Sequence, residues 1–371
     1  MRRLFLAGLV ALLASSAQAA DIKREPFGAT KVGVPVEKTI LRNDLGMTVA
    51  AIDYGATLTM VSAPDRAGRF ENVILNLPSV AAYEATSRRW ASVIGRYAGR
   101  ITDARITVDG KSYALPAGNN HMTLHGGPNG YDKRVWTSRP VSDARSVGVA
   151  FELHSPDGDQ GFPGALDLTV TYRLMRKANE LRIEYVAKAA APTVLNLTNH
   201  GFLNLAGAES GDVRDQTIWL DADRYAEVDG RKAPSGKLLP VEGTVLDFRK
   251  ARREGEAMKL DDPLLSPSQG FDHSLAFRAA KPGVRAVAWM EDPVSGRRVT
   301  VLTDQPSVQI NSGNGFDGTE KGPGGATYPK YGGFAFETQH LPDSPNQPAF
   351  PSTKLRPGRV FKSTTILRFS R

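Results

Sequence analysis

Apolar and polar residues alternate along many short stretches of the chain, and the clearest case predicts a β-hairpin. In residues 166–174 an apolar side chain stands at every second position, from Leu166 to Leu174, with polar residues between them. The alternation resumes in residues 181–185, after a turn at 177–179. Alternate side chains of a strand point to opposite faces, so each segment predicts a strand with one buried face. The short connection predicts that the two strands pair antiparallel.

Similar short runs recur along the chain and favour an all-β fold. They lie at residues 48–52, 147–153, 284–289, 299–302 and 365–369. Helical periodicity is weak, and its best candidate is a short helix over residues 79–86, where Pro78 and Ser79 are start signals. Many short strands with few short helices predict a large antiparallel β-sandwich, in which sheets pack face to face.

Composition adds turns but no domain boundary. The 36 glycines and 24 prolines are spread along the chain, as expected of turns between many strands. Two Gly- or Pro-rich segments, residues 321–325 and 341–351, lie inside the patterned region and are interpreted as loops. We find no internal repeat and no linker, so residues 20–371 are predicted to form a single domain.

The first 19 residues have the pattern of a secretory signal peptide. Arg2 and Arg3 form a basic start, residues 4–13 are apolar, and Ala17-Gln18-Ala19 matches a cleavage site. The apolar run is shorter than the roughly 20 residues that span a bilayer as a helix, although a retained anchor is the alternative interpretation. We therefore predict a periplasmic protein with no membrane anchor after cleavage. The general secretory route is favoured, and the paired arginines leave the twin-arginine route open.

The formal net charge of +8 does not form a nucleic-acid footprint. Basic residues are scattered, and the densest group, Arg249, Lys250, Arg252 and Arg253, is followed directly by acidic residues. A nucleic-acid surface would show a one-sided basic stripe with interleaved aromatic residues. We interpret the group as a solvated turn and expect no nucleic-acid partner. The chain has no cysteine, which excludes disulfides, thiol catalysis and thiolate metal sites.

Histidines in polar, glycine-bracketed segments are the main candidates for chemistry. Of the six histidines, four stand in such segments: His125, His200, His273 and His340. His121 and His125 have the spacing of a zinc pair on a helix, but no Glu lies between them and two glycines follow, which disfavours a helix. No nucleophile elbow, phosphate loop or dinucleotide fingerprint occurs. Histidines in such segments suit general acid–base catalysis near neutral pH, but they do not indicate which reaction is catalysed.

Seven motifs in a fixed order resemble those of the aldose 1-epimerase (galactose mutarotase) family. They are residues 93–101 (VIGRYAGRI), 124–127 (LHGG, followed by GYDK at 130–133), 157–164 (DGDQGFPG), 196–200 (NLTNH), 271–273 (FDH), 308–314 (VQINSGN) and 336–339 (FETQ). The resemblance extends from about Phe27 to the C-terminus. It implies a galactose mutarotase-like β-sandwich with a groove on one face, which agrees with the strand pattern.

The resemblance also implies an activity, the interconversion of the α and β anomers of free aldoses such as glucose and galactose. It assigns catalysis to Glu337, as base for the anomeric hydroxyl, and to His200, as an imidazolium acid for the ring oxygen. His125 would stabilise charge at the ring oxygen or hold the sugar. Three further residues would bind sugar hydroxyls: Arg100, Asp272 and Gln309. No metal and no cofactor are implied, and the expected partner is a free monosaccharide bound by a monomer or homodimer.

Two positions depart from the family pattern, and two other functions stay open. Gly99 stands where many members have an Asn that contacts sugar, so sugar preference could be wider, and Ser312 stands where Thr is common. The alternatives are a non-catalytic sugar-binding protein on the same fold and an epimerase of hexose 6-phosphates. The acid–base pair argues against the first. The second would need an Arg-rich pocket, and export argues against phosphorylated substrates.

Overall fold

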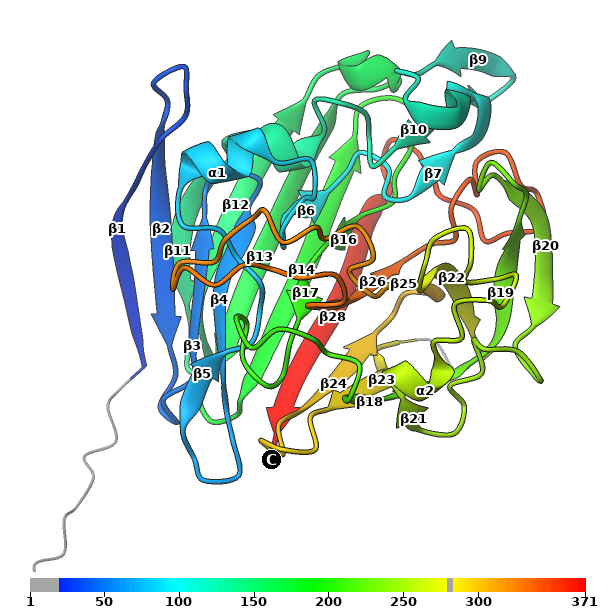
Figure 1. Ribbon diagram of the computed structural model, residues 1–371. Helices are drawn as coiled ribbons and strands as arrows, with labels where there is room; N and C mark the ends of the chain where they lie inside the picture. The colour runs from blue at the N-terminus through cyan, green and yellow to red at the C-terminus, as the bar shows by residue number, and fades with distance from the viewer. Residues whose placement is uncertain (1–19, 279–282) are drawn as a thin grey trace, which may run out of the picture.

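The largest sheet of the computed structural model has nine strands and runs across the molecule (Figure 1). The structure describes residues 20–278 and 283–371, so the predicted signal peptide in residues 1–19 lies outside the described residues. Neighbouring strands of this sheet are all antiparallel. In spatial order they are β11 (Thr137–Ser142), β12 (Ser146–Ser155), β13 (Leu166–Met175), β14 (Glu180–Ala189), β28 (Val360–Ser370), β24 (Arg298–Thr303), β23 (Arg285–Glu291), β18 (Thr217–Leu220) and β21 (Arg252–Arg253).

Two smaller sheets and several strand pairs complete the β-structure. The six-stranded sheet has the order β17 (Phe202–Leu203), β26 (Phe334–Gln339), β25 (Ser307–Asn311), β22 (Asp272–Phe277), β19 (Ala222–Val228) and β20 (Pro234–Pro240). The five-stranded sheet follows chain order from β1 (Asp21–Ala29) through β2 (Pro35–Arg42), β3 (Thr48–Ile52) and β4 (Thr57–Pro64) to β5 (Phe70–Asn72). Isolated pairs are β6 (Val93–Ile94) with β16 (Thr198–Asn199), β7 (Arg100–Ile101) with β10 (Thr123–Leu124), β8 (Arg105–Val108) with β9 (Lys111–Ala114), and β15 (Thr193–Val194) with β27 (Lys354–Leu355).

The inner faces of the two larger sheets share one apolar core. Ile183 and Tyr185 of β14 and Leu367 of β28 line a residual cavity of only about 20 Å³ together with Phe336 of β26. The same cluster of buried side chains includes Val49 of β3, so the five-stranded sheet packs against this core as well. The structure therefore confirms the predicted all-β sandwich. The packing fixes β26, whose polar side chains are used below, against the nine-stranded sheet.

Several predicted elements agree closely with the structure. The hairpin of β13 and β14 pairs Leu174 with Leu181, and β3 has the predicted bounds. The predicted short helix is α1 (Val80–Ala85), and the Ser79 side chain accepts a hydrogen bond from the N–H of Ala82 as an N-cap. Within residues 20–278 and 283–371, no helix has the length and hydropathy needed to cross a membrane.

The basic group at residues 249–253 has no buried residue, as its composition suggests, but its last two residues belong to regular structure. Arg252–Arg253 form β21, and the short helix α2 (Glu254–Ala257) follows directly. Glu254 is 0% exposed, and neither of its carboxyl oxygens has a hydrogen-bond partner among the residues that the structure describes. Burial raises the pKa of Glu254 well above its usual value. An acidic residue that composition places at the surface is thus fully buried, and burial favours its protonated form.

Glu254→Gln is expected to stabilise the protein increasingly as the pH rises. Because the folded-state pKa of Glu254 lies above the unfolded-state value, folding takes up a proton between the two, and the wild type loses stability as the pH rises through this window. Glutamine does not titrate, so the variant does not lose stability in this window. Its free energy of unfolding relative to the wild type should therefore rise by up to about 1.4 kcal/mol per pH unit. Urea unfolding of both proteins from mildly acidic to mildly alkaline pH measures this gain. A difference that does not change with pH would contradict the buried, protonated state.

Candidate active site

Strand register places four polar side chains on one face of the six-stranded sheet. Glu337 of β26 lies directly opposite Gln309 of β25, and Gln309 lies opposite Ser274 of β22. Asp272 stands two residues before Ser274 on the same strand. Cross-strand partners and residues two apart share a face, so all four point to the same side. On the other side of β26, Phe336 and Thr338 face the core.

The two histidines come from short strand pairs that lie beside this face. His200 follows β16, donates its backbone N–H to the carbonyl of Ser92, and accepts a hydrogen bond from the N–H of Ala91, each at 3.0 Å. His125 follows β10 and adopts a left-handed backbone with φ of 53°. The centres of the two imidazole rings are 5.3 Å apart, and the rings are nearly perpendicular. Backbone hydrogen bonds therefore hold both rings at the edge of the polar face.

One cavity of about 200 Å³ brings together all six site residues that the sequence suggested. They line it as Arg100, His125, His200, Asp272, Gln309 and Glu337. A second cavity of about 380 Å³ adjoins the first, because both are lined by Arg100, Asp272 and Gln309. Six residues spread over more than two hundred positions of sequence thus converge on one place, as a binding site requires.

Glu337 and His200 form the central contact of this cavity. His200 Nε2 lies 3.4 Å from Glu337 Oε1, and the residues are only 8% and 1% exposed. Burial, reinforced by the negative charge of Asp272, raises the pKa of Glu337 to about 8. Burial, reinforced by the positive charge of Arg89, lowers the pKa of His200 to about 4. Between these values the pair holds one proton.

The position of that proton differs from the expectation of a carboxylate beside an imidazolium. In the unliganded cavity the two shifts favour a protonated Glu337 and a neutral His200, because burial penalises both charged forms. The ion-pair form contains the same single proton, and attraction across 3.4 Å stabilises it. A proton shared between two groups suits a reaction in which acid and base exchange roles.

His125 is fixed as a hydrogen-bond donor towards the cavity. The backbone N–H of Gly99 donates to His125 Nδ1 at 3.2 Å, so this nitrogen carries no proton. The proton of the neutral ring therefore lies on Nε2. Burial, followed by the positive charge of Arg89, lowers the pKa of His125 well below its usual value. At neutral pH the ring is uncharged and offers its Nε2–H to a ligand oxygen.

Asp272 is the centre of a charged and hydrogen-bonded network. Its Oδ2 lies 3.0 Å from Arg100 Nη2 and 3.2 Å from Lys232 Nζ, and its Oδ1 accepts a hydrogen bond from Gln309 Nε2 at 2.8 Å. Burial alone would raise the pKa of Asp272, but the charges of Arg100 and Lys232 outweigh it and lower the pKa to about 2. The network keeps Asp272 ionised and orients donors and acceptors for sugar hydroxyls.

The same three side chains could also be considered as metal ligands. One ligand atom each from His125, His200 and Glu337 can be chosen so that all lie within 4.8 Å of one another. Binding a metal through the cavity-facing Nε2 of His125 would require the proton to move to Nδ1, where it would face the N–H of Gly99. The hydrogen bond of Gly99 thus favours proton chemistry and hydrogen bonding over metal ligation.

The other histidines lie outside this cluster. His121 is exposed in a short turn, so the spacing that resembled a zinc pair does not bring it to His125 in the cluster above. His273 lies on β22 with its ring bonded to the N–H of Asp272 and the carbonyl of Leu264. His340 follows β26, and its Nδ1 contacts Gln305. His273 and His340 hold backbone and loops in place.

Sequence reasoning missed several residues that line or border the cavity. Arg89 and Phe202 line it, and Phe202 packs its ring 5.2 Å from that of His200. Lys232 reaches Asp272 from the loop between β19 and β20. Arg89 has a positive φ of 55°. This backbone conformation and the path of the β19–β20 loop depend on tertiary structure, so local sequence patterns do not predict them. The only sequence signal was the Arg88-Arg89 doublet before the first motif.

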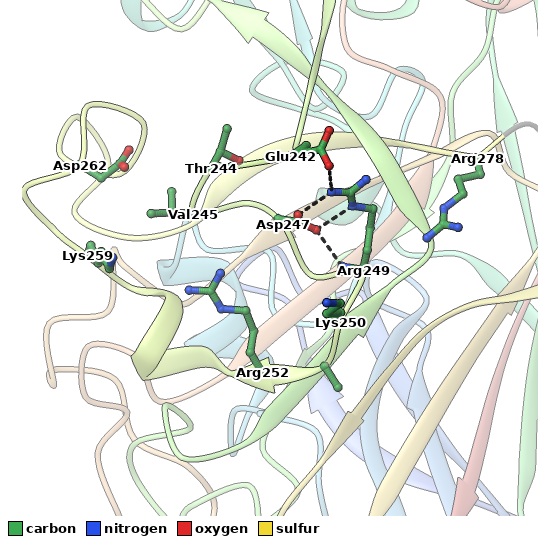
Figure 2. Close-up of a pocket in the computed structure, with 12 residues that line it drawn as sticks. Glu242, Thr244, Val245, Asp247, Arg249, Lys250, Arg252, Lys259, Asp262 and Arg278 are labelled. Atoms are coloured by element: carbon green, nitrogen blue, oxygen red, sulfur yellow. Dashed lines mark hydrogen bonds and ion pairs between the residues drawn. The ribbon is translucent and has the colours of Figure 1, made fainter.

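A larger cavity lies elsewhere and has a different character (Figure 2). It measures about 890 Å³ and shares no lining residue with the cavity of Glu337. Figure 2 shows Arg249 held between Asp247 and Glu242, and their closest contact is 2.7 Å, from Arg249 Nη2 to Asp247 Oδ2. The acidic and basic side chains that line this larger cavity neutralise one another in part. They include no buried acid and base in contact like Glu337 and His200.

Comparison with known proteins identifies relatives over nearly the whole chain. The family model described as aldose 1-epimerase matches residues 37–368. A human galactose mutarotase is 41% identical over 352 residues, which cover 95% of this chain and 99% of that protein. An aldose 1-epimerase of Escherichia coli K12 is 37% identical over 91% of this chain and 96% of its own length. A solved galactose 1-epimerase from Lactobacillus acidophilus superposes with a TM-score of 0.83 at 28% identity, covering 95% of this chain and 99% of that chain.

Proposed function

The chain belongs to the aldose 1-epimerase family, and we propose that its Glu337–His200 pair moves the protons that interconvert sugar anomers. The protein is an isomerase that interconverts the α and β anomers of an aldose. We propose D-galactose and D-glucose as substrates. The single observation that carries the catalytic assignment is the 3.4 Å contact between two buried groups with oppositely displaced pKa values.

The reaction needs two proton transfers and no other chemistry. Glu337 accepts the proton of the anomeric hydroxyl while His200 donates a proton to the ring oxygen. The bond between C1 and the ring oxygen breaks, and C1 becomes the carbonyl carbon of the open-chain aldehyde. Rotation about the C1–C2 bond presents the other face of the carbonyl. Closure reverses both proton transfers, so the pair ends each cycle with the single proton with which it began.

The remaining residues of the cavity orient the sugar. The Nε2–H of His125 donates to the ring oxygen or to a hydroxyl beside it, where negative charge develops as the ring opens. Arg100, Asp272 and Gln309 hold hydroxyls through the network described above. The aromatic ring of Phe202 borders the cavity and excludes water beside His200. One positioned acid or base gives about 10²–10⁴-fold, so two suffice for a reaction that already proceeds in water.

The rate of mutarotation should depend on pH as a bell with limbs near the two displaced pKa values. Below about pH 4 His200 is protonated as well as Glu337, so the pair holds two protons. Above about pH 8 Glu337 is deprotonated, so the pair holds none. Both changes remove the one-proton state, so activity should be highest between the two pKa values. Initial rates at constant ionic strength across this range measure the profile. A rate that keeps rising well above pH 8 would show that a deprotonated pair is the active form.

We further propose that the protein works outside the cytoplasm, without a membrane anchor. The proposal rests on the basic, apolar and A-x-A segments of residues 1–19. N-terminal sequencing of the protein purified from its own cell envelope should begin at Ala20. A start at Met1, or recovery in the cytoplasmic fraction alone, would reject export.

Polarimetry of freshly dissolved α-D-galactose and α-D-glucose tests the proposed substrates. Purified protein should speed the approach to rotational equilibrium without changing the final rotation. A protein that binds either sugar in calorimetry yet leaves the rate at that of buffer would instead be a sugar-binding protein. A panel of other aldoses in the same assay ranks the substrates.

A further inference from the structure

Arg89 is a third arginine in the cavity, beside the proposed acid and base. It lines the cavity with Arg88 and Arg100, and its side chain is 19% exposed. The carbonyl of Arg89 accepts a hydrogen bond from the N–H of Ser92, whose own carbonyl accepts from the N–H of His200. Its positive charge acts on His125, His200 and Glu337 alike. Arg89 therefore lies close to all three reacting groups.

The three arginines differ in how closely protein carboxylates pair with their guanidinium groups. Arg100 binds Asp272 at 3.0 Å, and Arg88 binds Asp317 at 2.8 Å and Glu320 at 2.5 Å. Arg89 has a longer ion pair with the buried Asp132, whose Oδ2 lies 3.9 Å from Arg89 Nε, beyond hydrogen-bond distance.

Most of the donors of Arg89 have no partner in the part of the chain that the structure describes. Nη1 donates to the carbonyl of Ser87 at 3.0 Å, and the buried Nε has no partner within residues 20–278 and 283–371. A guanidinium has five N–H donors in a planar fork, so most of its capacity is unused. A charged group with unused donors at the wall of a cavity is built to meet an anion.

The position of Arg89 points to one end of the sugar. In the proposed reaction His200 serves the ring oxygen, and in a hexopyranose that oxygen is bonded to C5, which carries C6. A group at C6 therefore lies on the His200 side of the ring, where Arg89 lines the cavity. Asp272, which also lines the cavity, forms ion pairs with Arg100 and Lys232, which offset part of its negative charge.

We propose that the preferred substrate is a hexuronic acid, whose C6 carboxylate pairs with the guanidinium of Arg89. This inference rests on the proposed function, because it places the sugar by the role of His200. A planar carboxylate matches the fork of a single guanidinium and carries one negative charge. A phosphate group carries about −1.5 to −2 near neutral pH, which the single positive charge of one arginine does not balance. The carboxylate is thus the better match than a C6 phosphate.

The test compares sugars that differ only at C6. The kcat/KM for mutarotation is measured with D-galacturonate, D-galactose, galacturonic acid methyl ester and D-galactose 6-phosphate at neutral pH and constant ionic strength. A charged hydrogen bond contributes about 1.5–3 kcal/mol, so the wild type should favour galacturonate over galactose by about 10–100-fold. The uncharged methyl ester should lose that preference. This comparison uses the wild-type protein alone and does not depend on how any variant folds.

Variants then locate the preference at Arg89. Arg89→Gln should lower the ratio of kcat/KM for galacturonate to that for galactose by about 10–100-fold, and Arg89→Lys should lower it less, because the charge is kept and the fork is lost. Arg88→Gln is the matched control, since it removes an equal charge at the same cavity wall. Its donors are occupied by Asp317 and Glu320, so the ratio should change by less than about threefold.

Each outcome separates the inference from the function on which it rests. If neutral hexoses are turned over but galacturonate is no better, or if Arg89→Gln leaves the ratio unchanged, the hexuronate assignment is wrong and the epimerase activity stands. A preference for the 6-phosphate over galacturonate also overturns it. If no sugar of either charge is accelerated, the proposed function itself fails.

Discussion

Glu337→Gln is expected to lower kcat for mutarotation by about 10²–10⁴-fold, the usual contribution of one positioned acid or base. Glutamine has the same shape but can neither accept nor release a proton at this pH. The 3.4 Å contact with His200 then joins two groups that no longer share a titrating proton. Because the change removes an interaction used only in the transition state, KM for the sugar should change little. Initial rates by polarimetry at several sugar concentrations measure both constants.

The structure provides a matched control for this substitution. Glu254 is also a fully buried glutamate with a raised pKa, yet it lies outside the cavity of Glu337. Glu254→Gln should therefore keep kcat within about threefold of the wild type. Thermal unfolding should show that neither variant is less stable, because each loses a carboxyl group that is costly to bury. If Glu337→Gln retained wild-type kcat, Glu337 would have no role in proton transfer.

His200→Asn should have an effect of the same size, about 10²–10⁴-fold in kcat. Asparagine can donate and accept hydrogen bonds but cannot carry a proton between the sugar and Glu337. The acidic limb of the pH profile near pH 4 should disappear with the imidazole, because that limb reports its protonation. Rates across the acidic range in the variant and the wild type measure this loss.

The double variant distinguishes a cooperating pair from two independent groups. If Glu337 and His200 share one proton, removal of either disables the pair, and Glu337→Gln with His200→Asn should be little worse than either single variant. Multiplicative losses would mean that the two side chains act separately. His154→Asn serves as a control, since His154 is an exposed histidine on β12 that does not line the cavity. Its kcat should equal that of the wild type.

The sequence predicts strands with one solvent-exposed face better than it predicts the strands that carry the active-site residues. β13 alternates buried with less buried residues, so its period of two is visible from Leu166 to Met175. β26 is buried at all six positions, because one of its faces packs on the core and the other lines the cavity. Its apolar and polar residues both lie inside, so hydrophobic alternation does not mark it. The family motif, and not periodicity, revealed Glu337.

Proton positions and charge neutralisation were beyond the reach of the sequence. The residue types at 200 and 337 suggest an acid and a base, but burial is what exchanges their preferred protonation states in the unliganded cavity. Likewise Lys232 pairs with Asp272 only because the β19–β20 loop brings it to β22. Arg89 lines the cavity because its backbone is left-handed, and no local sequence pattern predicts this conformation. These features depend on distances between segments far apart in the chain.

The central claim is that one proton shared by Glu337 and His200 opens and closes the sugar ring. The most direct measurement is NMR exchange between the α and β anomeric protons of D-galactose at equilibrium, with wild type and Glu337→Gln at equal concentration and neutral pH. The wild type should transfer magnetisation between the two signals far faster than buffer, and Glu337→Gln should reduce this enzyme-dependent rate by at least about 10²-fold. Exchange no faster than in buffer with the wild type, or equally fast with both proteins, would contradict the account.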